Sequence, residues 1–315
     1  MSYVITGASG HIGNNFVRFL NEKRKDENIV ALTRRAVARE LEGAVCTQVL
    51  GDICDADFLA ANIKKEDTVI CLAGYIDLAD NEPEMCERIN FTAAKVICDI
   101  CREKGARFIY VGSVDGIYKE GEGEIPEPEA FYPDKMEGNY ARTKAAASAY
   151  VLDAIKKYPD FSAAILLPSA VIGINDYKPS AVGGVVRDTI KGKAQFGIKG
   201  GYNFVDVLDV CEVLLALCES DKRDTYIVSG HSVTVEQLYR AVCKVCGRKA
   251  HPVIIPTAIV KLCIPFIKVL NKTTVRALTE MHAYSNKKAQ SELGFTPTPF
   301  EVTAERTVRW FEENF

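Results

Sequence analysis

Short runs of β-branched and aliphatic residues recur along the first half of the chain, and longer stretches with apolar residues at three- and four-residue spacing lie between them. The short runs fit buried strands, and the longer stretches fit amphipathic helices. The predicted strands are residues 3–6, 29–32, 45–50, 68–72, 107–111 and 163–167. The clearest predicted helices are residues 11–24, 83–104, 137–158 and 300–315. This alternation predicts an α/β fold, a Rossmann doubly wound parallel sheet.

The pattern changes after residue 167, where the regular alternation gives way to shorter helical and strand segments. We therefore predict a dinucleotide-binding Rossmann domain over residues 1–167 and a smaller substrate-binding lobe that takes up most of residues 168–315. Elements near 203–230 are expected to return to the Rossmann sheet. The acidic, proline-rich stretch 119–135 is predicted to be a surface loop that forms a wall of the substrate cleft.

The composition of this 315-residue chain, 48% hydrophobic and 26% charged, is typical of a soluble globular protein. A formal net charge of -3 gives no general attraction to nucleic acid or to an anionic membrane. The apolar stretch 254–270 is interrupted by prolines and lysines and falls short of the ~20 apolar residues of a spanning helix. We expect an amphipathic surface or lid helix there, without stable membrane insertion.

Eleven cysteines raise the question of disulfides and metal sites. The count is odd and no signal peptide precedes the first predicted strand, so we expect a protein of the reducing cytoplasm. Cys98 and Cys101 have the spacing of a metal-binding pair, as do Cys243 and Cys246, but both pairs lie in segments with helical periodicity and are far apart in the chain. We therefore expect no bound metal and interpret the cysteines as small hydrophobic residues.

A glycine-rich turn directly follows the first predicted strand and opens the first predicted helix. In this position Gly7 allows a tight turn, Gly10 lets the backbone approach a phosphate, and Gly13 lets the helix pack on the strand. Backbone N–H groups at the start of the helix then bind a pyrophosphate, assisted by the helix dipole. The residues predicted to form this cofactor site are Gly7, Ser9, Gly10, His11, Ile12 and Gly13.

The end of the second predicted strand bears on the choice of cofactor. A NAD enzyme usually places an acid there to bind the adenosine ribose, whereas this chain has Arg34 and Arg35. Guanidinium groups suit the additional phosphate of NADP, so NADP is the predicted cofactor and NAD the alternative. The alternative is that the two arginines do not select the cofactor. They would be solvated, or would stack on the adenine of either cofactor. Asp52 and Ile53, after the third strand, are expected to meet the adenine.

Tyr140 and Lys144 are four residues apart in a predicted helix, so their side chains leave from the same face. Reduction of a carbonyl by hydride requires a proton for the new alkoxide, and a phenol delivers it more readily when a cation lowers its pKa. Lys144 supplies that cation and is also expected to hold the nicotinamide ribose. Ser113 follows a buried strand at the carboxyl edge of the sheet and is expected to donate a hydrogen bond to the substrate oxygen.

Together these motifs resemble the extended short-chain dehydrogenase/reductase superfamily, the NAD(P)-dependent epimerases, dehydratases and related reductases, over nearly the whole chain. The resemblance implies that Asn90 joins Ser113, Tyr140 and Lys144 in the catalytic set. It also implies that Ala73 and Gly74 border the cofactor. One position departs from the pattern, because a second hydroxyl residue often precedes the catalytic serine and this chain has Gly112 there.

Two later segments, 165–173 and 202–210, look like those of dihydroflavonol 4-reductase-like and 3β-hydroxysteroid dehydrogenase-like members. The resemblance places Pro168 and Ser169 at the cofactor and implies that helices 83–104 and 137–158 meet in any homodimer. Further candidates for the pocket wall, with ordinary loop or packing roles as the alternative, are Asp115, Tyr118, Asp176, Tyr177 and Tyr202.

The expected activity is an oxidoreductase that transfers hydride between NADP(H) and a small-molecule ketone, aldehyde or secondary alcohol. Two other functions stay open. A sugar-nucleotide epimerase or dehydratase would keep tightly bound NAD, and Arg34 and the Pro168-Ser169 pair argue against it. A non-catalytic NADP-sensing protein of the same fold would commonly lack Tyr140 and Lys144, so their presence disfavours it.

Overall fold

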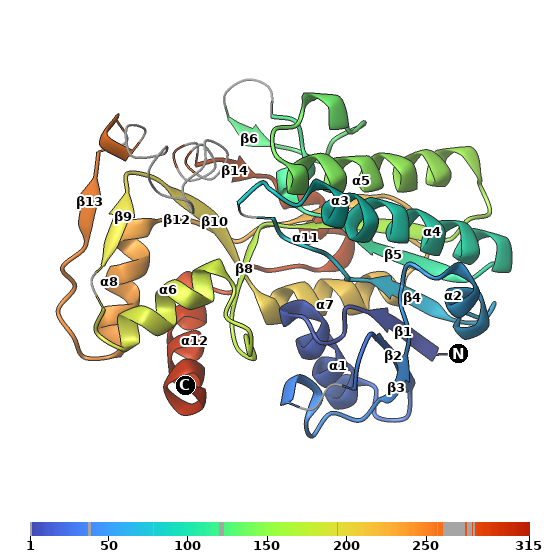
Figure 1. Ribbon diagram of the computed structural model, residues 1–315, viewed down its shortest axis with the longest axis horizontal. Coiled ribbons are helices and arrows are strands. Elements are labelled where there is room, and N and C mark those ends of the chain that lie inside the picture. Colours follow the sequence, from blue (N-terminus) through green and yellow to red (C-terminus); the bar gives the residue numbers. More distant parts are fainter. Residues whose placement is uncertain are drawn as a thin grey trace.

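The computed structural model describes residues 2–36, 39–77, 79–119, 123–193, 195–256, 258–260, 275, 279 and 281–315. Its centre is a sheet of seven strands in the order β11-β7-β5-β4-β1-β2-β3, with every neighbouring pair parallel (Figure 1). The strands are β1 Ser2–Thr6, β2 Asn28–Thr33, β3 Thr47–Leu50, β4 Thr68–Cys71, β5 Arg107–Val111, β7 Ala163–Pro168 and β11 Thr225–Val228. The predicted Rossmann doubly wound sheet is confirmed.

Helices cover both faces of this sheet, and each face has its own apolar core. One face packs against α1 His11–Lys23, α7 Val207–Cys218 and α11 Lys287–Leu293. The other packs against α2 Ala56–Asn62, α4 Ala93–Lys104 and α5 Asn139–Lys157. The strand order reverses between β1 and β4, and ligands of doubly wound sheets bind in the crevice outside the carboxyl ends of the strands at such a point.

A smaller lobe lies beside the carboxyl edge of the large sheet (Figure 1). It contains a three-stranded sheet, formed by β8 Ala170–Ile172, β10 Gly201–Asp206 and β12 His231–Thr234. Its core packs that sheet against α6 Ala181–Ile190, α8 Val235–Val245 and α12 Phe300–Asn314. Two short strand pairs complete the described elements, β9 Phe196–Ile198 with β13 Val253–Ile255, and β6 Glu124–Ile125 with β14 Ala283–Tyr284.

The chain returns to the large sheet after residue 206, because α7 packs on it and β11 extends it beside β7. β10, which precedes α7, instead pairs with β8 and β12 in the smaller lobe. A boundary at residue 167 stays a prediction. The predicted helix 83–104 is three consecutive helical pieces, α3 Pro83–Cys86, a π-helical turn over Glu87–Thr92, and α4.

The predicted loop 119–135 includes β6 and a 3₁₀ turn over Pro133–Lys135. Most of the stretch 254–270, expected to form a surface or lid helix, lies outside the described residues. Among the helices that the structure describes, none has both the length and the apolar character to cross a membrane.

Candidate active site

The glycine turn after β1 is held by close backbone contacts. Gly7 adopts a φ of +71°, and a Cβ there would lie 2.7 Å from the backbone nitrogen of Ala73. A Cβ on Gly13 would lie 2.2 Å from the carbonyl oxygen of Gly7. The turn therefore has no room for side chains at these two positions, which brings α1 onto the strand as the motif requires.

The start of α1 has the properties of a phosphate-binding site. Gly10 is its N-cap and offers no side chain to the first N–H groups of the helix. No acidic residue lies in the first turn. The free N–H groups and the positive end of the helix dipole therefore face the cavity beside the turn, which is an arrangement that binds an anion.

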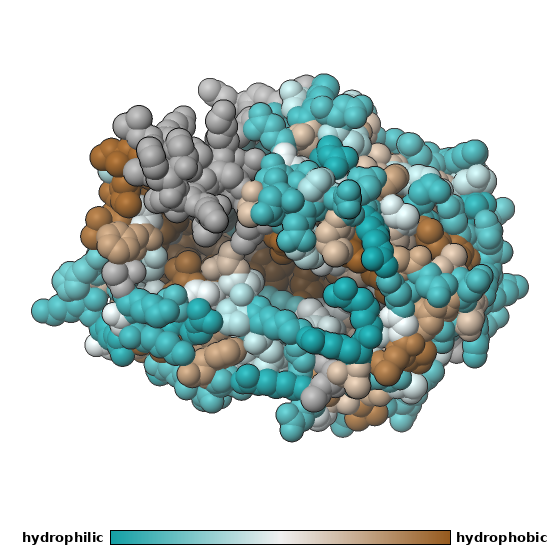
Figure 2. All heavy atoms as spheres, in the orientation of Figure 1, coloured by the Kyte–Doolittle hydropathy of each residue, from teal (hydrophilic) through white to brown (hydrophobic). Residues whose placement is uncertain are grey.

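That cavity has a volume of about 830 Å³ and runs from the glycine turn to the carboxyl ends of β5 and β7 and on to the smaller lobe. Figure 2 shows a hollow near the centre of the visible face, with hydrophobic residues inside it and mostly hydrophilic residues around it. The cavity is large enough for a dinucleotide end together with a small substrate. The predicted site residues on its wall are Gly7, Ser9, Gly10, His11, Ile12, Gly13, Gly74, Ser113, Tyr140, Lys144, Pro168 and Ser169.

Unpaired buried polar atoms agree with a polar ligand in this region. Ser169 Oγ and Asn14 Oδ1 belong to residues of the cavity wall, and neither has a hydrogen-bond partner in the described structure. Thr33 Oγ1, at the end of β2, is a third such atom. Buried polar atoms are normally paired, so three orphans along the cofactor cradle fit a dinucleotide that would satisfy them.

The predicted adenosine end lies outside the wall of that cavity. Arg34 and Arg35 are exposed and directly follow β2. Asp52 is half-buried and forms an ion pair with Arg88, and its Oδ1 accepts a hydrogen bond from the backbone of Cys54 at 3.0 Å. These contacts, the Cys54 hydrogen bond first, keep the pKa of the Asp52 carboxyl below its usual value. Ile53 is buried beside it.

Ser113 lies at the carboxyl end of β5, where it caps a 3₁₀ turn over Val114–Gly116. Its Oγ accepts a hydrogen bond from the backbone N–H of Asp115 at 3.1 Å. Because a hydroxyl has one hydrogen, this contact on the acceptor side leaves the O–H to donate, and the Tyr140 phenol lies within its hydrogen-bonding reach. The local turn thus orients the side chain as a donor.

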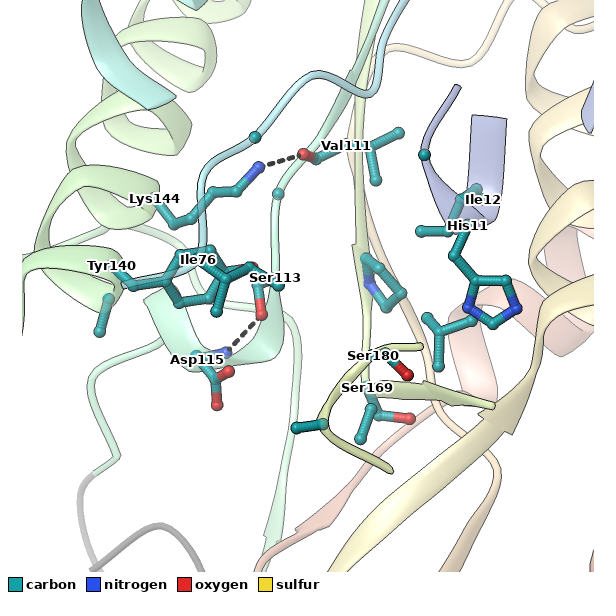
Figure 3. Close-up of a pocket in the computed structure, with 18 of the residues that line it drawn as sticks. His11, Ile12, Ile76, Val111, Ser113, Asp115, Tyr140, Lys144, Ser169 and Ser180 are labelled. Carbon is teal, nitrogen blue, oxygen red and sulfur yellow. Dashed lines mark hydrogen bonds between the residues drawn. The ribbon is translucent and has the colours of Figure 1, made fainter. Parts of the chain in front are cut away.

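Tyr140 and Lys144 lie in the first turns of α5, and Figure 3 shows them with Ser113 on one side of the cavity, while His11, Ser169 and Ser180 lie opposite. Burial raises the pKa of the Tyr140 phenol, the Asp115 carboxylate raises it further, and the Ser113 hydroxyl lowers it. Burial also lowers the pKa of Lys144 to about 8. The Lys144 ammonium donates a hydrogen bond to the carbonyl oxygen of Val111 at 2.9 Å.

Asn90 organises the loop after β4 from within the π-helical turn. Its Oδ1 accepts from the backbone of Tyr75 at 2.7 Å, and its Nδ2 donates to the carbonyl of Tyr75 at 2.9 Å and to Thr143 Oγ1 at 3.1 Å. A π turn is a rare local form that recurs at functional sites. Asn90 itself is buried off the cavity wall, so its contacts link α5 to the loop that carries Ala73 and Gly74.

Gly74 lies between the Asn90 and Lys144 side chains. A Cβ at this position would lie 3.5 Å both from Asn90 Oδ1 and from Lys144 Nζ. These are ordinary van der Waals distances, so the loop at Gly74 lies directly beside the lysine. Ala73 contacts the glycine turn from the same loop.

The departure at Gly112 has a packing reason. A Cβ there would lie 2.6 Å from Leu167 Cδ2 and 3.1 Å from Ser148 Oγ. Ser148 therefore occupies the space beside position 112 with a hydroxyl of its own, which donates to the carbonyl of Lys144 at 2.8 Å. A larger residue at position 112 would require both neighbours to move.

A polar clamp that was not predicted joins His11, Asn14 and Asn15 of α1 to the backbone of Ile174 and Asn175, which follow β8 of the smaller lobe. His11 Nε2 lies 2.9 Å from the carbonyl oxygen of Ile174, and Asn15 Nδ2 donates to the same oxygen at 2.9 Å. Asn14 Nδ2 donates to the carbonyl of Asn175 at 3.1 Å. Two adjacent asparagines on the buried side of a helix were the one available signal, since such residues need partners. Burial lowers the pKa of His11.

Five residues proposed for the pocket wall, Asp115, Tyr118, Asp176, Tyr177 and Tyr202, all line the cavity. Asp176 is held by Ser180, whose backbone nitrogen and hydroxyl both donate to Asp176 Oδ2, at 2.8 and 2.7 Å. Among the residues that the structure describes, no three His, Cys, Asp or Glu side chains form a group able to hold a metal ion.

Comparison with known proteins identifies the class. Residues 3–229 match the NAD dependent epimerase/dehydratase family, so the chain belongs to that family. It is similar to sterol demethylase protein B of Methylococcus capsulatus, with 24% identity over 99% of both chains. It is also similar to a putative dihydroflavonol 4-reductase of Synechocystis, with 24% identity over 99% of this chain and 95% of that protein.

Two further similarities are weaker, the first because it covers only part of each chain and the second because the sequence identity is low. The sterol-4-alpha-carboxylate 3-dehydrogenase, decarboxylating, of Mus musculus is 27% identical over 64% of this chain and 54% of that protein. Among solved structures, a UDP-glucose 4-epimerase of Thermotoga maritima with UDP-glucose has a TM-score of 0.82 and 20% identity, covering 99% of each chain. The likeness to that structure shows the fold alone. The resemblance to extended short-chain dehydrogenases/reductases is therefore confirmed as family membership.

Proposed function

We propose that this protein is an NADP(H)-dependent dehydrogenase/reductase that interconverts a secondary alcohol and a ketone, or an alcohol and an aldehyde, on a small molecule. One observation carries the proposal: Ser113, Tyr140 and Lys144 converge on one wall of a cavity whose other wall starts at the glycine turn. One relative that matches over nearly its full length, the putative dihydroflavonol 4-reductase, has a name that agrees with it.

When bound, the nicotinamide would supply or accept the hydride. Gly7, Gly10 and the first turn of α1 would hold the pyrophosphate, and Ser169 would meet the nicotinamide end. Ser113 would donate a hydrogen bond to the substrate oxygen and place the reacting carbon toward the cofactor. Tyr140 would give its phenolic proton to that oxygen in reduction and take it back in oxidation.

Lys144 has two roles in this proposal. Its ammonium lies next to the end of β5 and would stabilise the Tyr140 phenolate and bond the cofactor ribose. Arg34, exposed after β2, would bind the additional phosphate of NADP, which an acid at this place would repel. The absence of an acid directly after β2 favours NADP over NAD.

The test is the consumption of NADPH and of NADH, followed by nicotinamide absorbance, with purified protein and a panel of steroid ketones, flavonoid-like ketones and simple aldehydes. We expect turnover with NADPH well above NADH for at least one class. Consumption of neither cofactor across the panel would contradict the reductase function.

A sugar-nucleotide epimerase or dehydratase is the second candidate, because a dTDP-glucose 4,6-dehydratase of Mycolicibacterium smegmatis is 25% identical over the whole chain. Such an enzyme would purify with NAD bound and would convert a sugar nucleotide without net consumption of cofactor. Mass spectrometry of the denatured protein's supernatant, with a UDP- and dTDP-sugar assay, distinguishes the two.

A further inference from the structure

A carboxylate lies next to the Ser113 hydroxyl, and the proposed function gives it no role in the reaction. Asp115 is two residues beyond Ser113, in the 3₁₀ turn Val114–Gly116, and it lines the cavity. Its backbone N–H donates to Ser113 Oγ, so the same turn fixes both residues. Figure 3 shows Asp115 beside Ser113, on the Tyr140 side of the cavity.

The Asp115 carboxylate is available to a ligand. Within the part of the chain that the structure describes, its oxygens take part in no hydrogen bond or ion pair, and the residue is exposed to the cavity. Other carboxylates on this wall differ. Asp176 is held by Ser180, and Asp77 Oδ2 accepts from the backbone of Glu82 at 2.7 Å and from Asn139 Nδ2 at 3.0 Å.

The negative charge of Asp115 affects the pKa of three tyrosines. It contributes to raising the pKa of the Tyr140 phenol, after burial. It has the same secondary effect on Tyr202, whose pKa burial raises to about 12, and on Tyr284. These tyrosines come from α5, β10 and β14, and two of them, Tyr140 and Tyr202, line the cavity together with Asp115.

We infer that Asp115 is a specificity-determining residue of the substrate site, which accepts a hydrogen bond from a substrate hydroxyl next to the reacting carbon and excludes substrates that carry an anionic group at that place. The inference rests on the proposed function, because it presumes that the reacting carbonyl lies at Ser113 and Tyr140. The substrate class that it names is the neutral α-hydroxy ketone and the corresponding vicinal diol.

The chemistry follows from charge and geometry. A carboxylate accepts a hydrogen bond from a hydroxyl, and hydrogen bonds to charged groups are stronger than those between neutral groups. An anion placed against it would meet like-charge repulsion. In reduction, bound NADPH would supply the hydride for the new C–H bond, the C=O π electrons would pass to the oxygen, and Tyr140 would give that oxygen its proton. NADP⁺ and the diol are the products, so Asp115 exchanges no atom.

Three aryl ketones of matched size test the inference in the NADPH complex: 2-hydroxyacetophenone, acetophenone and benzoylformate, with a hydroxyl, a hydrogen and a carboxylate as the neighbouring group. In Asp115→Ala the preference for 2-hydroxyacetophenone over acetophenone should fall about tenfold in kcat/KM. In Asp115→Asn, which removes only the charge, kcat/KM for benzoylformate relative to acetophenone should rise about tenfold. Where turnover is slow, dissociation constants of the ternary complex give the same ratios.

Asp153→Asn is the matched control, because Asp153 is an exposed carboxylate farther along α5. Both ratios should stay at the wild-type value in this variant. Ratios that change by less than about twofold in the two Asp115 variants would overturn the inference while leaving the proposed function intact. Failure of all three ketones to bind or react would overturn the inference, whereas the proposed function is decided separately by the NADPH and NADH panel.

A pH profile adds a readout that a purely structural role would not move. In oxidation of 1-phenylethanol with NADP⁺, kcat/KM should rise with pH as Tyr140 loses its proton. The groups that act on this phenol are Ser113, Asp115, Cys86 and Tyr110, and Lys144 lies one turn along the same helix. Asp115→Asn removes a negative charge and should move the midpoint to lower pH, whereas an unmoved midpoint would overturn the electrostatic part of the inference.

Discussion

Lys144 and Val111 are joined by a hydrogen bond of 2.9 Å, from the lysine Nζ to the valine carbonyl oxygen at the end of β5. The bond ties the cation on α5 to the strand that also positions Ser113. Lys144 is 4% exposed, so the ammonium has lost most of its contact with water. Its position therefore has an energetic cost, which one carbonyl oxygen offsets only in part.

The burial of Lys144 predicts a pH-dependent stability. Its pKa falls from 10.5 to about 8 in the folded protein, so between these values the unfolded chain holds a proton that the folded protein has released. Stability therefore increases with pH across this window. Relative to Lys144→Met, wild-type stability should rise by about 3 kcal/mol between pH 8 and 10.5, measured by urea unfolding without cofactor. A difference that is flat with pH would contradict the buried charge.

Tyr140→Phe removes the proposed acid and leaves its packing in place. We expect turnover to fall by about 10²–10⁴-fold. The dissociation constant of NADPH, followed by its fluorescence, should change less than about threefold, because the phenol acts on the substrate oxygen. Tyr132→Phe is the control, since Tyr132 is an exposed tyrosine that is not part of the cavity wall. Retained turnover in Tyr140→Phe would remove this residue from its role.

The parts of the site that the sequence predicted are those built by local pattern. The glycine turn depends on β1 and α1, which adjoin it, and Tyr140 and Lys144 share one helix. The clamp between Asn15 and Ile174 joins residues far apart in the chain, and no local pattern encodes it. The π turn at Asn90 is also invisible, because its apolar spacing resembles that of an ordinary helix.

Prediction of the fold is limited in the same way, because contacts between distant segments are not visible in a local pattern. Elements near 203–230 were expected to return to the Rossmann sheet, yet β10 joins the smaller sheet because its partners there are β8 and β12. α2 was not predicted, since it is seven residues long and fully buries Leu59 alone. Pairing and short helices are decided by tertiary contacts, which outweigh local preference.

The NADP preference rests on the exposed Arg34 and is open to direct measurement. Arg34→Ala should weaken NADPH binding by about 10–100-fold, the value of a charge-assisted hydrogen bond, and should change NADH binding by less than about threefold. Arg35→Ala shows whether the neighbouring guanidinium shares the role. Arg240→Ala, an exposed arginine paired with Glu236 on α8, is the control. Equal losses for both cofactors would mean that Arg34 contacts something other than the additional phosphate.

Alanine substitutions at Gly7 and Gly43 distinguish the cost of backbone strain from the cost of steric contact. Both have a left-handed φ, +71° and +74°, but a Cβ on Gly7 would meet the Ala73 backbone at 2.7 Å, whereas a Cβ on Gly43 would have no neighbour within 4 Å. Gly43→Ala should therefore cost only the strain of the left-handed conformation, about 1–2 kcal/mol of unfolding free energy. Gly7→Ala carries the same strain and must also push the β4 loop away, so it should cost at least about 1 kcal/mol more.

Because that loop also carries Gly74, next to Lys144, Gly7→Ala should weaken NADPH binding while Gly43→Ala leaves it unchanged. Equal destabilisation by the two variants in urea unfolding would mean that the turn and the loop are not in contact in solution.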